Sequence, residues 1–167
     1  MATIDDSFQK ILTKVESLKN DNSFDLSLEE DLSLAVMNLI SLEEHFFFTS
    51  QKTGKDSYLD LLNQTREIRK ELLGRMIDQH EGETWCISKH LLGTTMRIME
   101  VATKLQTLKK DKEAKKMFAT AYKIYTLFWG VRLKLIDLKD VHKKPSSSDT
   151  EWTYEDIVSK LVDCCKE

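Results

Sequence analysis

The sequence predicts an all-α protein, built as an up-down-up-down four-helix bundle with a short extra helix at each terminus. The 167 residues include one proline and five glycines, and so few breakers favour long uninterrupted helices. Apolar residues recur at helical spacing through most of the chain. The long periodic stretches are separated by turns of a few residues, and such short connections make consecutive helices antiparallel neighbours.

Local signals place the first three helices. Apolar residues at helical spacing predict a short helix over residues 4–18. The segment SLEE at residues 27–30 has the pattern of a capping box, which predicts a long second helix from there to about Gly54. Asp56 is expected to cap a third helix that runs to about His80.

The same reasoning places two further long helices. A fourth helix is expected from about Thr84 to Leu108. Asp111 can cap a fifth, which is expected to end near Leu138. Four helices of this size would each be roughly 37 Å long, which suits a bundle.

The composition changes near the C-terminus. The segment KKPSSSD at residues 143–149 has the composition of a flexible linker. We therefore divide the chain into a helical bundle domain of residues 1–142, this linker, and a C-terminal docking helix in residues 150–167. The docking helix carries an apolar set: Trp152, Ile157, Val158, Leu161 and Val162.

Composition and charge exclude several classes of protein. The net charge of −3 gives no global attraction for nucleic acid. No apolar run approaches the roughly 20 residues that a membrane span needs. The N-terminus lacks a secretory signal, and three cysteines, two of them adjacent, do not form a disulfide framework. We therefore expect a cytoplasmic protein with no membrane or nucleic-acid partner.

Several polar residues fall on helix faces that are otherwise apolar. At about 100° per residue, Glu43 lies inside the apolar arc of the second helix. Arg69 lies at the centre of the arc on the third helix, with Arg66 on its flank, and Arg97 flanks the arc on the fourth. Folding the chain back at each turn brings these residues to one level, together with Tyr125 of the fifth helix. The sequence thus predicts a buried polar layer centred on Glu43 and Arg69.

Two interpretations of this layer stay open. A buried glutamate needs a cationic partner, so the layer can be an ion pair that only fixes the register of the helices. Alternatively, arginines in excess of the glutamate can bind an anionic small molecule between the helices, with Glu43, Arg66, Arg69, Arg97 and Tyr125 as the site. We expect no cofactor and no metal, because the Glu-x-x-His motifs of di-metal bundles do not occur. The leading hypothesis is a binding or interaction module, and whether the protein is an enzyme stays open.

One short motif supports an alternative from a different functional class. The segment RMIDQH, from Arg75 to His80, resembles the Arg-x4-His pattern of the HEPN ribonucleases, which are small helical bundles. The resemblance implies a metal-independent ribonuclease in which Arg75 and His80 act on the RNA backbone at a dimer interface. These two residues point to different sides of one helix, so such an enzyme would need a second subunit.

The fourth helix has two apolar faces. The main arc, taken to face the bundle, contains Ile87, Leu91, Thr94, Ile98 and Leu105. A second strip contains Leu92, Met96 and Met99, and it predicts a homodimer interface if no part of the chain covers it. Lysines crowd the following turn, where they form a solvated surface or make a weak contact with RNA, an anionic surface or an acidic partner: Lys104, Lys109, Lys110, Lys112, Lys115 and Lys116.

Overall fold

A computed structural model describes residues 13, 16–17, 25–77 and 83–136 of the chain. Over these residues the protein is all-helical, which confirms the fold class, and no strand is present. Its helices are α2 (Leu26–Thr53), α3 (Ser57–Met76), α4 (Glu83–Thr107) and α5 (Asp111–Arg132). The predicted helix in residues 4–18 lies outside the described residues apart from positions 13 and 16–17, and the linker and the C-terminal docking helix lie outside them entirely.

The start of α2 corrects the predicted capping box. The N-cap is Asp25, whose Oδ1 accepts hydrogen bonds from the backbone N–H groups of Ser27 (2.9 Å) and Leu28 (3.2 Å). Ser27 is therefore inside the helix, because an aspartate just upstream satisfies the first N–H groups instead. The predicted end is confirmed: Gly54 adopts a left-handed conformation with φ of 67°, and its N–H binds the Ser50 carbonyl.

The ends of α3 and α5 lie earlier than predicted. Asp56 precedes α3 but makes no side-chain capping bond, and the helix stops at Met76 because Ile77 turns to an extended conformation. Ile77 is buried, so its packing ends the helix four residues before the predicted limit at His80. The fifth helix stops at Arg132 rather than near Leu138, and a left-handed residue follows it at position 134, with φ of 54°.

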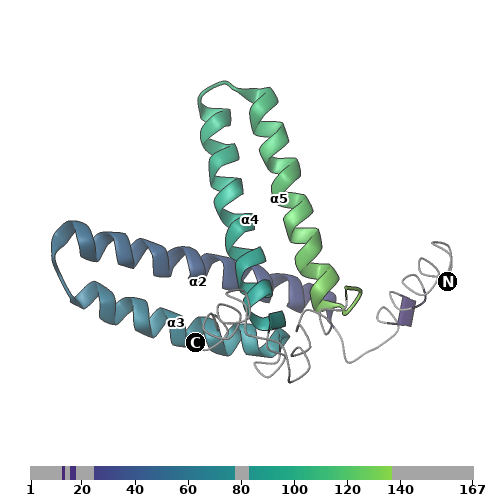
Figure 1. The fold of residues 1–167 in the computed structure, drawn as a ribbon, viewed down its shortest axis with the longest axis horizontal. Coiled ribbons are helices and arrows are strands. Elements are labelled where there is room, and N and C mark those ends of the chain that lie inside the picture. Colours follow the sequence, from purple (N-terminus) through teal and green to yellow (C-terminus); the bar gives the residue numbers. More distant parts are fainter. Residues whose placement is uncertain (1–12, 14–15, 18–24, 78–82, 137–167) are drawn as a thin grey trace, which may run out of the picture.

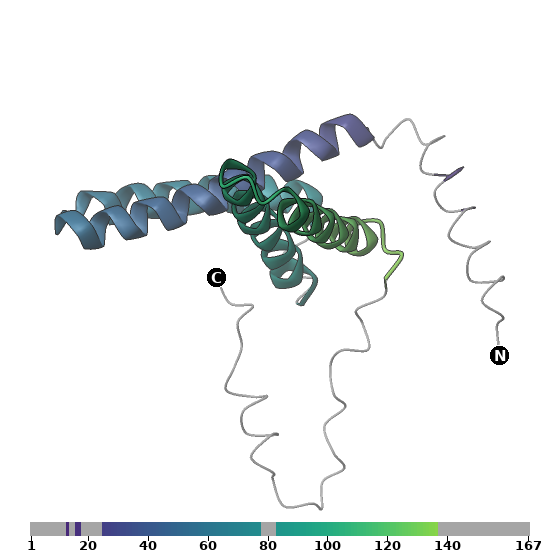
Figure 2. The same cartoon turned by 90° about the horizontal axis from the view of Figure 1, so that it is seen from above.

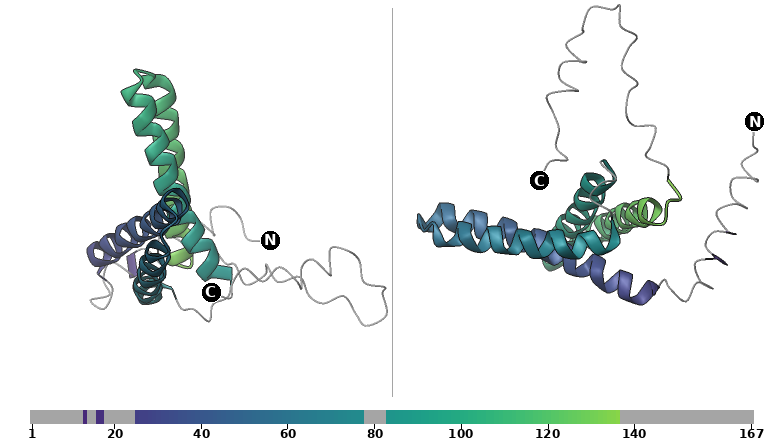
Figure 3. Two further views of the ribbon diagram at one scale, coloured as in Figure 1. Left: turned by 90° about the vertical axis from the view of Figure 1, so that its left-hand side faces the viewer. Right: turned by 90° about the horizontal axis from the view of Figure 1, so that it is seen from below.

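The helices form two antiparallel hairpins, α2–α3 and α4–α5, which cross steeply (Figure 1). The two perpendicular views agree that α4 and α5 run away from the α2–α3 pair rather than along it (Figures 2 and 3). The up-down-up-down bundle is therefore not confirmed, although both short turns produce the predicted antiparallel neighbours. The contacts that join the hairpins are mainly those between α2 and α4.

Small residues explain why α2 and α4 can approach so closely at one point. A Cβ added to Gly93 of α4 would lie 3.2 Å from Cγ2 of Ile40 on α2. That spacing is too tight for most side chains, so the glycine permits the close crossing. Helical periodicity gives the apolar faces of each helix but carries no information on this crossing.

The hydrophobic core lies where the hairpins cross. It joins all four described helices and consists of Val36, Met37, Leu73, Met76, Ile77, Trp85, Cys86, Leu92 and Phe128. Leu92 is fully buried and Met96 packs against this core, so the predicted homodimer strip is covered within the chain, and among its three residues Met99 alone is exposed. The second strip of α4 is therefore mostly its inner face, so the condition under which Leu92, Met96 and Met99 were expected to form a homodimer interface is not met.

Candidate functional site

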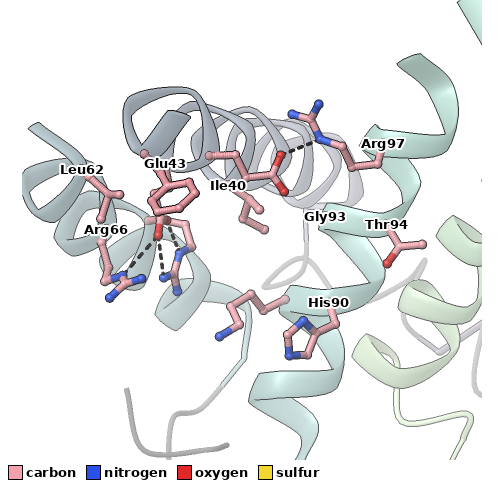
Figure 4. Close-up of a pocket in the computed structure, with 12 residues that line it drawn as sticks. Ile40, Glu43, Leu62, Arg66, His90, Gly93, Thr94 and Arg97 are labelled. Atoms are coloured by element: carbon pink, nitrogen blue, oxygen red, sulfur yellow. Dashed lines mark hydrogen bonds and ion pairs between the residues drawn. The ribbon is translucent and has the colours of Figure 1, made fainter. Parts of the chain in front are cut away.

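The predicted contact between Glu43 and Arg69 is confirmed. Nε of Arg69 donates to Oε1 of Glu43 at 2.7 Å, and its Nη2 reaches Oε2 at 3.4 Å. Nε of Arg66 donates to the same Oε2 at 3.2 Å (Figure 4). The side chain of Arg69 is 1% exposed and that of Glu43 is 12% exposed, so this charge pair is held largely out of water.

The hairpin geometry explains this cluster. Arg66 and Arg69 are three residues apart on α3, so both project toward the same side of that helix. Glu43 projects from α2, the antiparallel neighbour, at the same level. One carboxylate therefore receives guanidinium groups of two arginines, which have the planar donor geometry that a carboxylate accepts well.

Arg97 pairs with a different glutamate from the one expected. Its Nε lies 2.7 Å from Oε2 of Glu44, and its Nη2 donates to Oγ of Ser41. Sequence periodicity places Glu44 beyond the edge of the bundle-facing arc of α2, which is why this partner was missed. The crossing of the hairpins brings α4 against that edge, so Glu44 meets Arg97 there.

These charged residues line one pocket of about 540 Å³ between α2, α3 and α4 (Figure 4). Four predicted residues contribute to it: Glu43, Arg66, Arg69 and Arg97. The pocket also contains residues that sequence reasoning did not assign to the site: Lys89, His90, Gly93 and Thr94 of α4, with Glu44, Ile40, Phe47 and Leu62 from the α2–α3 hairpin. Its side chains include four cations and two carboxylates, which leaves an excess of positive charge even when His90 is not counted.

Tyr125, the fifth predicted residue, does not line this pocket. Its hydroxyl lies 2.7 Å from Oγ of Ser33 on α2, and Ser33 Oγ itself donates to the carbonyl of Glu30. Tyr125 was misplaced because the predicted up-down-up-down bundle puts α5 beside Glu43. The crossed hairpins instead put Tyr125 beside the first half of α2. The same displacement gives Arg132 a partner near the start of α2, Glu29, at 2.8 Å.

Two other chemistries can be examined in the described part of the chain. No three His, Cys, Asp or Glu side chains of residues 25–77 and 83–136 gather closely enough to hold a metal ion. Arg75 of the predicted ribonuclease pair is exposed and binds Glu71 at 3.1 Å, one turn earlier on α3. His80 lies outside the described residues, so the ribonuclease alternative stays a prediction.

Comparisons with protein-family models, with curated proteins and with solved structures find no match for this chain. Among the helices of the described segments, none combines the length and the apolar character that crossing a membrane requires. The pocket is therefore the feature of the described residues from which a function can be inferred.

Proposed function

We propose that the chain is a binding protein that holds an anionic small molecule in the pocket between α2, α3 and α4. The observation that carries this proposal is that Arg66 and Arg97, from separate hairpins, line opposite sides of one pocket whose side chains carry an excess of positive charge (Figure 4). We also place the protein in the cytoplasm, because its few cysteines do not suggest a disulfide framework and Cys86 is a buried thiol.

Each charged residue has a distinct part in this proposal. The side chains of Arg66 and Arg97 are 45% and 49% exposed, so a ligand can reach them. Each guanidinium has five N–H donors, and each uses Nε on a glutamate. Glu43 and Glu44 thus orient the two arginines. The terminal N–H groups of Arg66, and those of Arg97 that do not bind Ser41, can make contacts with a carboxylate or phosphate.

Arg69 supports the site from beneath. With 1% exposure it is too buried to contact a ligand, and it fixes the position of Glu43 instead. Ile40, Phe47 and Leu62 add apolar surface beside the arginines. This combination suits an anion that carries an apolar body, since apolar walls supply affinity and a few polar groups fix orientation.

The proposal is tested with thermal shift measurements on the full chain against inorganic phosphate and a panel of aliphatic and aromatic mono- and dicarboxylates. Any compound that raises the melting temperature is then titrated against Arg66→Gln and Arg97→Gln. Loss of a charge-assisted hydrogen bond costs about 1.5 to 3 kcal/mol, so each variant should bind at least about tenfold more weakly.

Arg75→Gln is the matched control. Arg75 also lies on α3 and also binds a glutamate, but it is on the exposed surface and does not line the pocket. It should bind the same compound as wild type does. Equal weakening in all three variants would show a nonspecific charge effect, and a panel without any stabilising anion would contradict the proposal.

A further inference from the structure

The α4–α5 hairpin carries a second feature that is independent of the pocket: an apolar face that the described residues leave uncovered. Three of its residues come from α4, one from the turn that follows it and three from α5: Ile98, Val101, Leu105, Leu108, Met117, Ile124 and Leu127. Val101, Leu108 and Leu127 are 47%, 66% and 49% exposed, and the other four are half-buried. We call this set the hairpin face.

These residues lie on the same side of both helices. Ala102 of α4 and Ala121 of α5 are buried, and α4 packs mainly against α5, so these two alanines mark the line of contact between the helices. At 100° per residue, all seven residues fall roughly 40° to 120° to one side of that line. On α4, the buried Leu92 lies on the opposite side, toward α2. The hairpin face therefore points away from the α2–α3 hairpin.

The borders of the hairpin face are strongly basic. Lys104 follows its α4 edge, and Lys116 and Lys123 follow its α5 edge. Residues 104–123 contain seven lysines against Asp111 and Glu113, a net charge of +5. A two-helix apolar surface with basic borders is the complement of an amphipathic helix with acidic flanks, which docks through residues at i, i+3, i+4 and i+7.

One segment of this chain has that pattern. Tyr154, Ile157, Val158 and Leu161 stand at i, i+3, i+4 and i+7. Residues 149–163 contain five acidic residues against Lys160, a net charge of −4. We propose that residues 149–163 dock as a helix on the hairpin face and complete a three-helix unit with α4 and α5. This proposal does not depend on the proposed ligand.

The chain is long enough for this contact. From Asp111, next to the turn that carries Leu108, to Arg132, α5 rises about 32 Å. Residues 137–148, which precede the docking segment, can extend to about 40 Å. The segment can therefore reach any part of the hairpin face in its own chain. It needs no second copy to do so.

Hydrogen–deuterium exchange on the full chain tests the proposal. Ile157→Asp with Leu161→Asp removes the apolar contacts of the segment. Exchange at backbone amides of residues 98–108 and 113–127 should become about tenfold faster, while amides of α2 and α3 keep wild-type rates. Only the local opening of the α4–α5 hairpin should change, because the two substitutions do not alter the hydrophobic core at the crossing.

Charge reversal provides the second and more specific part of the test. Glu151→Lys with Glu155→Lys should also accelerate exchange in the α4–α5 hairpin, and adding Lys116→Glu with Lys123→Glu should restore slow exchange. Lys55→Glu, in the turn of the other hairpin, is the matched control and should not restore it. Unchanged exchange in the apolar double variant would overturn the proposal. Protection that disappears on dilution of wild type would also overturn it, since a second copy would then cover the face.

Discussion

The double-mutant cycle at Glu43 and Arg69 should show strong coupling. In Glu43→Leu, the guanidinium of Arg69 stays buried at 1% exposure and loses the partner that lies 2.7 Å from its Nε. Removing one member of a buried ion pair costs about 3 to 5 kcal/mol, because the remaining buried charge loses a close charge-assisted contact that water cannot replace. Arg66 loses the same partner but is 45% exposed, so it can turn to solvent and adds little.

The structure predicts an asymmetry between the two single changes. In Arg69→Leu, Glu43 keeps Arg66 at 3.2 Å, so the carboxylate is not left alone. This change should therefore cost less than Glu43→Leu, close to about 3 kcal/mol. The double variant places an apolar pair in this position, and its cost should fall at least about 2 kcal/mol below the sum of the single costs.

Urea denaturation followed by circular dichroism gives all four free energies of unfolding. The control cycle uses Glu44 and Arg97, which are 42% and 49% exposed at a similar Nε–Oε2 distance of 2.7 Å. Its coupling should stay below about 1 kcal/mol, because water screens the charges. Additive costs at Glu43 and Arg69, or a larger cost for Arg69→Leu than for Glu43→Leu, would refute the reasoning.

Three further predictions concern packing and polar contacts. Gly93→Leu should lower the free energy of unfolding by about 1 to 3 kcal/mol in urea denaturation, because the Cβ of the new leucine would press on Ile40. Adding Ile40→Ala should recover part of this loss. Equal costs of Gly93→Leu with Ile40 and with Ala at position 40 would contradict the close crossing. Tyr125→Phe should cost about 1 kcal/mol by the same assay through the lost bond to Ser33, with ligand affinity unchanged in calorimetry; weaker binding would return Tyr125 to the site. Ser88→Ala should raise the melting temperature, because Ser88 Oγ is buried without a hydrogen-bond partner among the described residues; a lower melting temperature would show that Oγ has one.

Helical periodicity was enough to predict that the described residues form helices. Together with the short turns, it also predicted the antiparallel pairs α2–α3 and α4–α5. Breaker residues and apolar spacing predicted the long helices, and Gly54 marked the end of α2 as expected. The hairpin turn between α2 and α3 also fixed the register that brings Glu43 to Arg66 and Arg69. These features depend on local geometry and on short connections, which the sequence contains directly.

The crossing of the hairpins could not be predicted in the same way. Helix α4 is apolar on two faces, and periodicity alone does not show which of them packs against α2. The strip with Leu92 became the inner face of α4. Val101, which belongs to the hairpin face, is exposed. That choice depends on the fit of Gly93 against Ile40, a contact between residues far apart in sequence.

The errors in the site follow from that single choice. Because α5 diverges from the α2–α3 hairpin, Tyr125 meets Ser33 instead of Glu43. The same rotation of α4 presents His90 and Lys89 to the pocket and gives Arg97 a partner in Glu44. Arg66 and Arg69, which were placed through one short turn, were positioned correctly, whereas Tyr125, which was placed through three connections, was not.

The most direct test of anion binding in the pocket between α2, α3 and α4 is a titration of the ¹⁵N-labelled full chain, followed by nuclear magnetic resonance of the arginine Nε–H groups. Inorganic phosphate and the best anion of the thermal-shift panel serve as probes at low salt. If the pocket binds the anion, the Nε–H chemical shifts of Arg66 and Arg97 should change saturably with one shared dissociation constant, and those of Arg75 should not change. Equal, non-saturating shifts of all three arginines, or no shift at Arg66 and Arg97, would contradict a binding site between the hairpins.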